Sequence, residues 1–333
     1  MIWNLNQRAK AVQKQEVLGL DLGASSIKAV RLKRQKDEIH LVSTGVFPPI
    51  DLSGKSVAVF PRLPESLSAN YAAVCVSHEK SALRILTLAG TDDLEAQIRE
   101  QLGAGADTRF AHLPLTPPNV KPARVLAASL PQDCVDACLA LFRSGPPAAC
   151  SLELSGLSVL SACLYSLGEE SAQGPICVME AGAQSTYVFF LHRGAPVLVR
   201  KYDIGAIRLL EAIEAELEVD RETALGLVQE GAIDLSHIFR DVMESAVRQI
   251  VISRDFVERQ EKCRIGKILC SGAMTSSPFW RQMLRDTSAM EVEPWNPFSR
   301  LIVAADAMPT TQPGWESRFA CALGAALGVM ESP

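Results

Sequence analysis

Apolar and polar residues alternate in three consecutive segments that follow a polar leader of residues 1–16. The segments 17–22, 27–33 and 38–46 show the period of two that is typical of β-strands, and short turns separate them. They predict an antiparallel meander and therefore a mixed sheet. A dinucleotide-binding βα unit is not indicated, because its glycine-rich turn would open a helix.

Strands and amphipathic helices alternate over the rest of the chain, which predicts an α/β fold. Further strands are expected at 72–76, 82–88, 107–113, 123–130, 197–202, 267–271 and 290–292. Helices are expected at 92–102, 131–143, 154–167, 206–217, 220–229, 236–259, 278–286 and 319–329.

Two segments, 17–30 and 176–188, repeat the same order of residue types. In each, an apolar strand contains an acid, Asp21 or Glu180, and a glycine and hydroxyl residues follow at a turn before a second strand. Such a turn directs backbone N–H groups and hydroxyls at one spot, where they can hold a phosphate. One copy alone is most simply an ordinary hairpin turn. Two copies, one in each half of the chain, favour two lobes that face each other across a nucleotide.

Composition restricts the class of protein. A chain of 333 residues is long enough for two domains, and its net charge of −5 argues against binding nucleic acid by phosphate neutralisation. There is no apolar run of membrane-spanning length and no secretory signal, so we expect a cytosolic protein. The nine cysteines are scattered and are expected to be buried free thiols.

Four segments together resemble the actin-like nucleotide-binding superfamily, and within it the PilM family of type IV pilus and type II secretion assembly platforms. They are residues 18–32, 180–206, 267–284 and 319–328. The resemblance implies a two-lobed α/β fold of duplicated RNase H-like mixed sheets flanked by helices, with a small inserted subdomain of the kind shared with FtsA. The implied parts are a flexible leader 1–16, a first-lobe core 17–76, the insertion 77–150, a return to the first lobe 151–173, a second lobe 174–300 and a closing helix of the first lobe 301–333.

The resemblance also implies a site for ATP or ADP with Mg²⁺, and no catalytic residue. The implied nucleotide-binding residues are Asp21, Gly23, Ala24, Ser25, Ser26 and Lys28, then Gly182, Ala183, Gln184, Ser185, Thr186 and Gly205, and finally Ser271, Gly272 and Ala273 in place of the adenosine motif. Asp21 and Glu180 are the implied metal ligands. From the residues alone, Asp21 either holds Mg²⁺ through water or caps the turn. Lys28 either points at a phosphate or lies on a solvated strand.

Three departures from the family pattern weaken the nucleotide site. Glu180 stands where aspartate is usual, and Mg²⁺ is intolerant of a displaced carboxylate. Gly272 is followed by Ala273 and Met274 instead of further glycines, and 224–228 lacks the charges that grip a nucleoside in the family. We expect nucleotide binding to be weak or degenerate, with at most a weak ATPase activity.

The leading function implied by the resemblance is a scaffold at the inner face of the inner membrane. It would dock the cytoplasmic N-terminal tail of a PilN-like membrane protein in a groove beside the 77–150 subdomain, by strand addition, and it could self-associate. A sugar-kinase-like phosphotransferase is an alternative, but it needs a catalytic aspartate that the sequence does not present. An FtsA-like filament-forming ATPase is another, but that class carries a C-terminal amphipathic membrane helix, and this chain ends directly after the closing helix.

Overall fold

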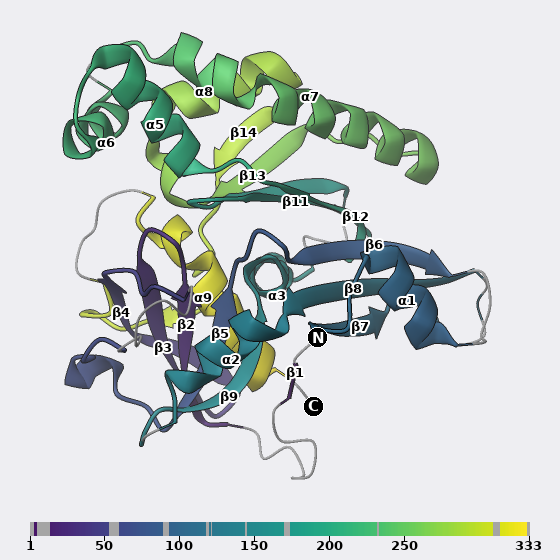
Figure 1. The fold of residues 1–333 in the computed structure, drawn as a ribbon, viewed down its shortest axis with the longest axis vertical. Coiled ribbons are helices and arrows are strands. Elements are labelled where there is room, and N and C mark those ends of the chain that lie inside the picture. The colour runs from purple at the N-terminus through teal and green to yellow at the C-terminus, as the bar shows by residue number, and fades with distance from the viewer. Residues whose placement is uncertain are drawn as a thin grey trace. The chain divides into compact units, whose positions relative to one another are not determined.

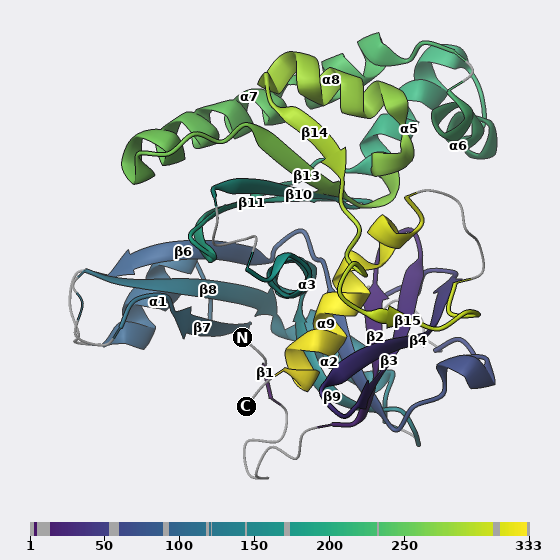
Figure 2. The same cartoon turned by 180° about the vertical axis from the view of Figure 1, so that it is seen from behind.

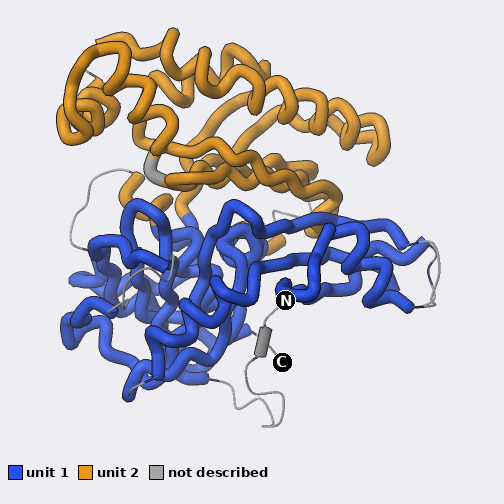
Figure 3. Tube along the Cα trace, viewed as in Figure 1, with its two compact units in different colours: residues 1–166, 297–311, 319–333 blue, residues 167–296, 312–318 orange. Residues whose placement is uncertain are grey.

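Two compact units make up the protein (Figure 3). Unit 1 comprises residues 1–166, 297–311 and 319–333, and unit 2 comprises residues 167–296 and 312–318. The structure is a computed structural model that describes residues 3–4, 14–52, 60–88, 93–117, 120, 122–143, 145–169, 174–231, 233–308 and 314–331. Most of the predicted leader, at 5–13, lies outside the described residues, whereas residues 3–4 form a short strand.

The main sheet of unit 1 is built around the predicted meander (Figures 1 and 2). The strands β2 (Glu16–Leu22), β3 (Ile27–Gln35) and β4 (Glu38–Phe47) are antiparallel neighbours. On the other side of β2, the strands β5 (Tyr71–Val76) and β9 (Ala148–Leu154) run parallel to it. Two short strands complete the sheet at its edges, β1 (Trp3–Asn4) beside β9 and β15 (Ile302–Val303) beside β4. The predicted mixed sheet is confirmed.

Two apolar helices follow in unit 1: α3 (Ser155–Leu167), which begins directly after β9 and contacts α9 at Gly324, and α9 (Ala320–Met330). A 3₁₀ turn (Glu65–Leu67) lies against β4. The helix α9 packs on β2 and β5. The approach is so close that a Cβ atom on Gly19 of β2 would lie 2.0 Å from the carbonyl oxygen of Ala322 in α9. The small residues of the predicted closing helix therefore allow backbone-to-backbone packing.

The insertion between β5 and β9 has the strand–helix–strand–strand–helix order that the sequence predicts. Its elements are β6 (Ala82–Leu88), α1 (Leu94–Leu102), β7 (Thr108–Pro114), β8 (Ala123–Pro131) and α2 (Gln132–Ala140). The strands form an antiparallel sheet in the order β6-β8-β7, and α1 buries Ile98 and Leu102 against it. The subdomain thus has a small core of its own.

Unit 2 repeats the sheet of unit 1. Its strands are β10 (Ile176–Ala181), β11 (Thr186–His192), β12 (Ala195–Tyr202), β13 (Lys267–Ser271) and β14 (Glu291–Pro294). Their order is β12-β11-β10-β13-β14, with an antiparallel meander and two parallel strands on the other side of β10. The central strands of unit 1 have the same order and directions, β4-β3-β2-β5-β9. The predicted duplication of an RNase H-like sheet is confirmed.

Four helices pack with the sheet of unit 2: α5 (Ala206–Leu217), α6 (Arg221–Glu230), α7 (Ser236–Glu261) and α8 (Pro278–Ser288). The stripe predicted on α7 is confirmed, because Met243, Val247, Ile250 and Val257 are all buried in the core cluster of this unit. Two 3₁₀ turns (Ala273–Ser276 and Glu316–Phe319) complete the secondary structure. Among the described residues, no helix combines the length and apolar character needed to cross a bilayer.

Candidate nucleotide-binding site

The two segments that the sequence singles out form hairpins of the same register. In unit 1, Leu22 pairs with Ile27, which leaves the four-residue turn 23–26. In unit 2, Ala181 pairs with Thr186, which leaves the four-residue turn 182–185. We refer to these as turn 1 and turn 2. The predicted likeness of the two segments is therefore one of backbone geometry and not only of residue type.

The first glycine of each turn is required by the same close approach. A Cβ atom on Gly23 would lie 2.8 Å from the carbonyl oxygen of Ser26, and one on Gly182 would lie 2.8 Å from that of Ser185. Contacts below 3.0 Å force a shift of the backbone, so both positions need glycine. Each acid also lies near its own turn, since Asp21 Oδ2 is 3.5 Å and both oxygens of Glu180 are 3.4 Å from these Cβ positions.

Turn 1 carries an ion pair that is largely buried. The Lys28 Nζ atom lies 3.6 Å from Asp21 Oδ2, and 16% and 9% of the two side chains are exposed. The Lys28 ammonium also donates a long hydrogen bond of 3.5 Å to the Ser26 carbonyl oxygen, which places the charge at the turn. The alternative of a solvated strand position for Lys28 is therefore wrong.

The other oxygen of Asp21 also has internal partners. Oδ1 accepts a hydrogen bond of 3.4 Å from Ser155 Oγ and a longer contact of 3.8 Å from Cys75 Sγ. A Mg²⁺ ion bound directly to Asp21 would have to displace Lys28 or these donors. The tip of turn 1 is different, because Ala24 and Ser25 are exposed and Gly23 and Ser26 are half-buried. Turn 1 thus fits a phosphate better than it fits a metal ion, because the backbone of the turn and the Lys28 ammonium are placed to contact a phosphate.

Turn 2 is braced from within unit 2. The Gly182 N–H donates to Ser185 O at 3.0 Å, and the first N–H groups of α5, from Ala206 and Ile207, donate to Gly182 O and Ala183 O. The Thr186 hydroxyl donates to Ile204 O at 2.7 Å. Ser185 and Thr186 are buried, and the exposed side chain of the turn is that of Gln184. The first two N–H groups of α5 are therefore bonded to the backbone of turn 2.

Two glycines that the resemblance assigns to the nucleotide have close backbone neighbours instead. A Cβ on Gly205 would lie 2.5 Å from Ala183 O. Gly272 has a φ of 96°, and its Cβ would lie 2.1 Å from Ala181 O. Gly205 therefore allows close backbone packing against turn 2, and Gly272 allows it against the end of β10. Next to them, Ser271 is fully buried beside Glu180 in the parallel register, and its hydroxyl has no partner among the described residues. Ala273 begins the following 3₁₀ turn.

A polar cluster beside Asp21 was not predicted from the sequence. The parallel register brings Asp21, Cys75 and Glu153 side by side near the carboxyl ends of β2, β5 and β9. Burial raises the pKa of Glu153 to about 7, while a 2.6 Å hydrogen bond from Ser158 Oγ opposes the shift. Burial, together with the charge of Asp21, raises the pKa of the Cys75 thiol, which therefore stays protonated and can donate. The sequence signal for this cluster is Glu153, an acid near the end of the otherwise mainly apolar strand β9.

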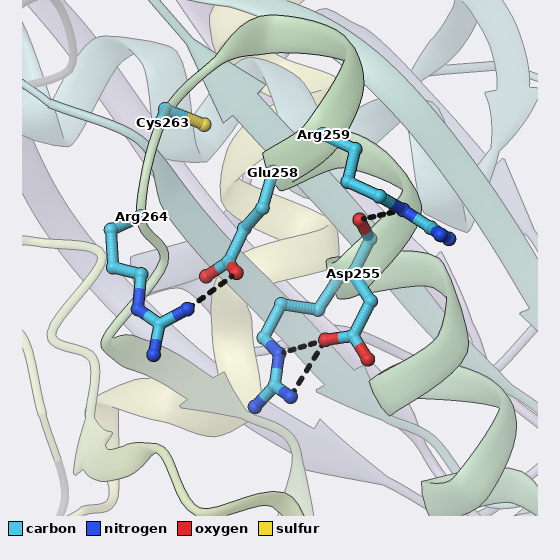
Figure 4. Close-up of a pocket in the computed structure, with 6 residues that line it drawn as sticks. Asp255, Glu258, Arg259, Cys263 and Arg264 are labelled. Atoms are coloured by element: carbon cyan, nitrogen blue, oxygen red, sulfur yellow. Dashed lines mark hydrogen bonds and ion pairs between the residues drawn. The ribbon is translucent and has the colours of Figure 1, made fainter.

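A hollow of about 610 Å³ lies elsewhere in unit 2, at the end of α7 (Figure 4). It is lined by Arg254, Asp255, Glu258, Arg259, Cys263 and Arg264. Its charges pair internally, with Arg254 bonded to Asp255 and Arg264 to Glu258. None of the predicted nucleotide residues lines it.

The predicted metal ligands are found in different units, Asp21 in unit 1 and Glu180 in unit 2. Within the described parts of the chain, no group of three or more histidine, cysteine, aspartate or glutamate residues is arranged to hold a metal ion. The structure therefore brings together the residues of turn 1 and, separately, those of turn 2 with Gly205 and Gly272.

No family model and no curated protein sequence matches this chain. A solved structure described as the PilM-PilN type IV pilus biogenesis complex matches with a TM-score of 0.77 and 20% identity, covering 97% of this chain and 100% of that chain. A Bacteroides thetaiotaomicron protein with an actin-like ATPase fold gives a TM-score of 0.48 and 8% identity, covering 95% of this chain and 96% of that one. The cytoplasmic domain of EpsL from the type II secretion system of Vibrio cholerae gives 0.37 and 10% identity, covering 62% and 75%. The resemblance seen in the sequence is thus matched at the level of fold: the chain has a duplicated, actin-like α/β fold similar to that of a chain in the PilM-PilN complex.

Proposed function

We propose that this protein is a cytoplasmic actin-like scaffold of a type IV pilus or type II secretion assembly platform, held at the inner face of the inner membrane through its partner. The observation that carries the proposal is the likeness of fold to the PilM-PilN structure over 97% of the chain. Coverage of that extent includes the inserted subdomain. The duplicated sheets place the chain in a fold class that serves many functions, so the inserted subdomain is the more telling part of the match.

The proposed partner is the cytoplasmic N-terminal tail of a PilN-like membrane protein, bound as an extended peptide beside the inserted subdomain. Support comes from the description of the similar structure as a complex of PilM with PilN. The subdomain also has β6 and β7 as edge strands, and Leu113 on β7 is 44% exposed. An exposed strand edge gives an extended peptide backbone partners, and an apolar side chain beside it gives specificity. Self-association is a second contact that such a scaffold could make.

The proposed role of ATP or ADP is that of a structural ligand or switch, and not of fuel. Its phosphates would be held by the backbone of turn 1, by the hydroxyls of Ser25 and Ser26 and by the Lys28 ammonium, which neutralises negative charge when the nucleotide is bound. In unit 2, Gln184 is the candidate that reaches solvent. The exposed tip of turn 1 supports this proposal, and the internal partners of Asp21 favour weak binding of Mg²⁺.

The partner proposal is tested by titrating the protein with a synthetic peptide that carries the cytoplasmic tail of a PilN-like protein from the same genome. Leu113→Glu should weaken binding at least about tenfold, because it places a charge beside the edge of β7. Leu225→Glu is the matched control, since Leu225 is similarly exposed at 42% but lies on α6 of unit 2. Equal affinities for both variants and the parent would contradict docking at this subdomain.

The nucleotide proposal has its own test. Nucleotide-stripped protein is titrated with ATP and Mg²⁺ in a calorimeter, beside a Ser25→Ala/Ser26→Ala variant. Binding that disappears in the variant supports turn 1 as the phosphate site. A folded parent that binds no nucleotide contradicts the ligand role and leaves the scaffold proposal to the peptide titration.

A further inference from the structure

The outer edge of β9 is occupied by a very short piece of this same chain. The strand β1 pairs with β9 in antiparallel fashion, with Trp3 opposite Leu152 and Asn4 opposite Ser151. The strand β9 has seven residues, so β1 covers only two of its positions on that side among the described residues. Figures 1 and 2 both show β1 beside β9, away from the strands that follow it in sequence.

The other end of the leader also lies against β5 and β9. Lys14 Nζ is 3.6 Å from the centre of the Tyr71 ring, and Tyr71 is paired with Ala148 at the start of β9. The positive charge of Lys14 also lowers the pKa of the Cys150 thiol in β9. Burial has the larger and opposite effect, and the pKa of this thiol is raised to about 11. Residues 3–4 and Lys14 are therefore held at this pair of strands, whereas Gln15, the next residue, accepts a hydrogen bond from Arg34 N of β3.

The edge of β9 carries an unsatisfied polar group. Ser151, which lies opposite Asn4, is 1% exposed, and its hydroxyl has no hydrogen-bond partner among the described residues. A buried hydroxyl without a partner is costly, so such groups are uncommon in native proteins.

The opposite edge of the sheet is closed more extensively. Besides β15, two further backbone hydrogen bonds join the segment after it to β4, from Ala304 N to Leu41 O and from Thr44 N to Ala307 O. The Thr44 hydroxyl also donates to Ala307 O at 2.8 Å. Among the described residues, the occupant of the β4 edge thus makes more hydrogen bonds to its neighbour than β1 makes to β9, which favours β9 as the edge where displacement occurs.

We propose that the outer edge of β9 is a strand-accepting surface, that residues 3–4 are its internal occupant, and that an extended partner tail displaces them. The proposal rests on the proposed function for the identity of the partner, but it assigns the backbone pairing of the tail to β9 instead of to the strand edges of the inserted subdomain. An incoming strand that pairs along all of β9 makes more backbone hydrogen bonds than the two-residue β1, which gives displacement its driving force. While β1 is in place, the apparent affinity for the tail is lowered by the fraction of molecules with a free edge.

The internal occupant is tested with two double variants of the full chain. Trp3→Pro/Asn4→Pro removes both N–H groups of β1, including the one that faces β9, because neighbouring residues of a strand direct these groups to opposite sides. Trp3→Ala/Asn4→Ala removes the same side chains but keeps the N–H groups. Hydrogen exchange of the β9 amides should accelerate about tenfold in the proline variant and remain near the parent rate in the alanine variant. Equal exchange in all three proteins would overturn the proposal, provided that circular dichroism shows all three folded.

Acceptance of a strand is tested with a labelled synthetic peptide of residues 1–13. It should bind a variant that lacks these residues and should bind the full chain at least about tenfold more weakly. Equal binding to both proteins overturns competition for the edge.

The PilN-like tail peptide then separates this proposal from the proposed function. Binding that is about tenfold tighter to the proline variant than to the parent supports displacement, and equal affinities overturn it. If the leader peptide binds the shortened chain while the tail peptide binds neither protein, the strand-accepting edge stands and the proposed partner fails.

Discussion

Gly324 of α9 meets Ser158 of α3 backbone to backbone, and a Cβ atom on the glycine would lie 1.6 Å from the Ser158 carbonyl oxygen. The two helices cross at this point without room for any side chain. The same Ser158 directs its hydroxyl to Glu153, so one residue joins the helix crossing to the buried polar cluster.

Gly324→Ala should therefore destabilise the protein by about 3 kcal/mol, because the methyl group forces the helices apart in a packed core. The measurement is the free energy of unfolding from a denaturant titration. The matched control is Gly226→Ala in α6, where a Cβ would meet no atom within 4 Å. Alanine there should be neutral or stabilising by up to about 1 kcal/mol, since it favours the helix. Similar losses in both variants would contradict the close crossing.

The ion pair of turn 1 leads to a second prediction. Lys28→Met leaves the buried Asp21 carboxylate without its cation and should cost about 3 kcal/mol of folding free energy. Adding Asp21→Asn to that variant should recover most of the loss, because the uncompensated charge is then gone. An exposed pair on α7, Arg248 with Glu244, serves as the comparison, and breaking it should cost less than about 0.5 kcal/mol. A double variant no more stable than Lys28→Met would argue against the pair.

Glu153 predicts a pH dependence of stability. Its pKa is raised from 4.5 to about 7 by burial, so between these values the folded protein holds a proton that the unfolded chain has lost. Stability must then fall as the pH rises through this window, by an amount on the order of 3 kcal/mol. Unfolding free energies at several pH values should show this fall in the parent and not in Glu153→Gln. Ser158→Ala removes the donor that opposes the shift and should extend the window to higher pH. Parallel curves for the parent and Glu153→Gln would refute the assignment.

Gly205 tests the bracing of turn 2. Gly205→Ala places a methyl group 2.5 Å from the Ala183 carbonyl oxygen and should cost about 2 kcal/mol while loosening the turn. Hydrogen exchange at residues 182–185 reports the loosening directly. Gly266→Ala, where a Cβ would meet nothing within 4 Å, should stay within about 0.5 kcal/mol of the parent. Unchanged exchange in the Gly205 variant would mean that the backbone can move aside.

Periodicity predicted the strands well where one face is buried and less well at their ends. The strand expected at 27–33 extends to Gln35, through polar residues, because its hydrogen bonds to β4 continue to a tight turn at Lys36. The strand expected at 197–202 similarly begins at Ala195, after the turn at Arg193 and Gly194. Side-chain patterns report burial, whereas the ends of a ladder depend on backbone pairing and turn geometry, which polar residues satisfy equally well.

The candidate site was predictable in its turns and less so in its partners. Acid, glycine and hydroxyl residues in one order were enough to find both turns, because each glycine is fixed by a contact within its own turn. The hydroxyl of Thr186 and the position of Gly205 depend on residues about twenty positions away. Glu153 lies in one row with Asp21, with Cys75 between them, only through the order of the sheet. Contacts between residues so far apart cannot be read from local sequence. The sequence therefore assigns to the nucleotide several groups that also have structural roles within the protein.

The segment that closes the edge of β4 has a consequence for colloidal behaviour. An uncovered edge strand presents a row of free N–H and C=O groups that recruits edges of other molecules and leads to aggregation. Residues 302–307 cover that row with backbone hydrogen bonds, while Ile302 and Val303 remain about two-fifths exposed. Loosening this short segment would therefore expose an aggregation-prone strand edge while the core of the protein is still folded. On heating, turbidity should then appear before the secondary structure is lost.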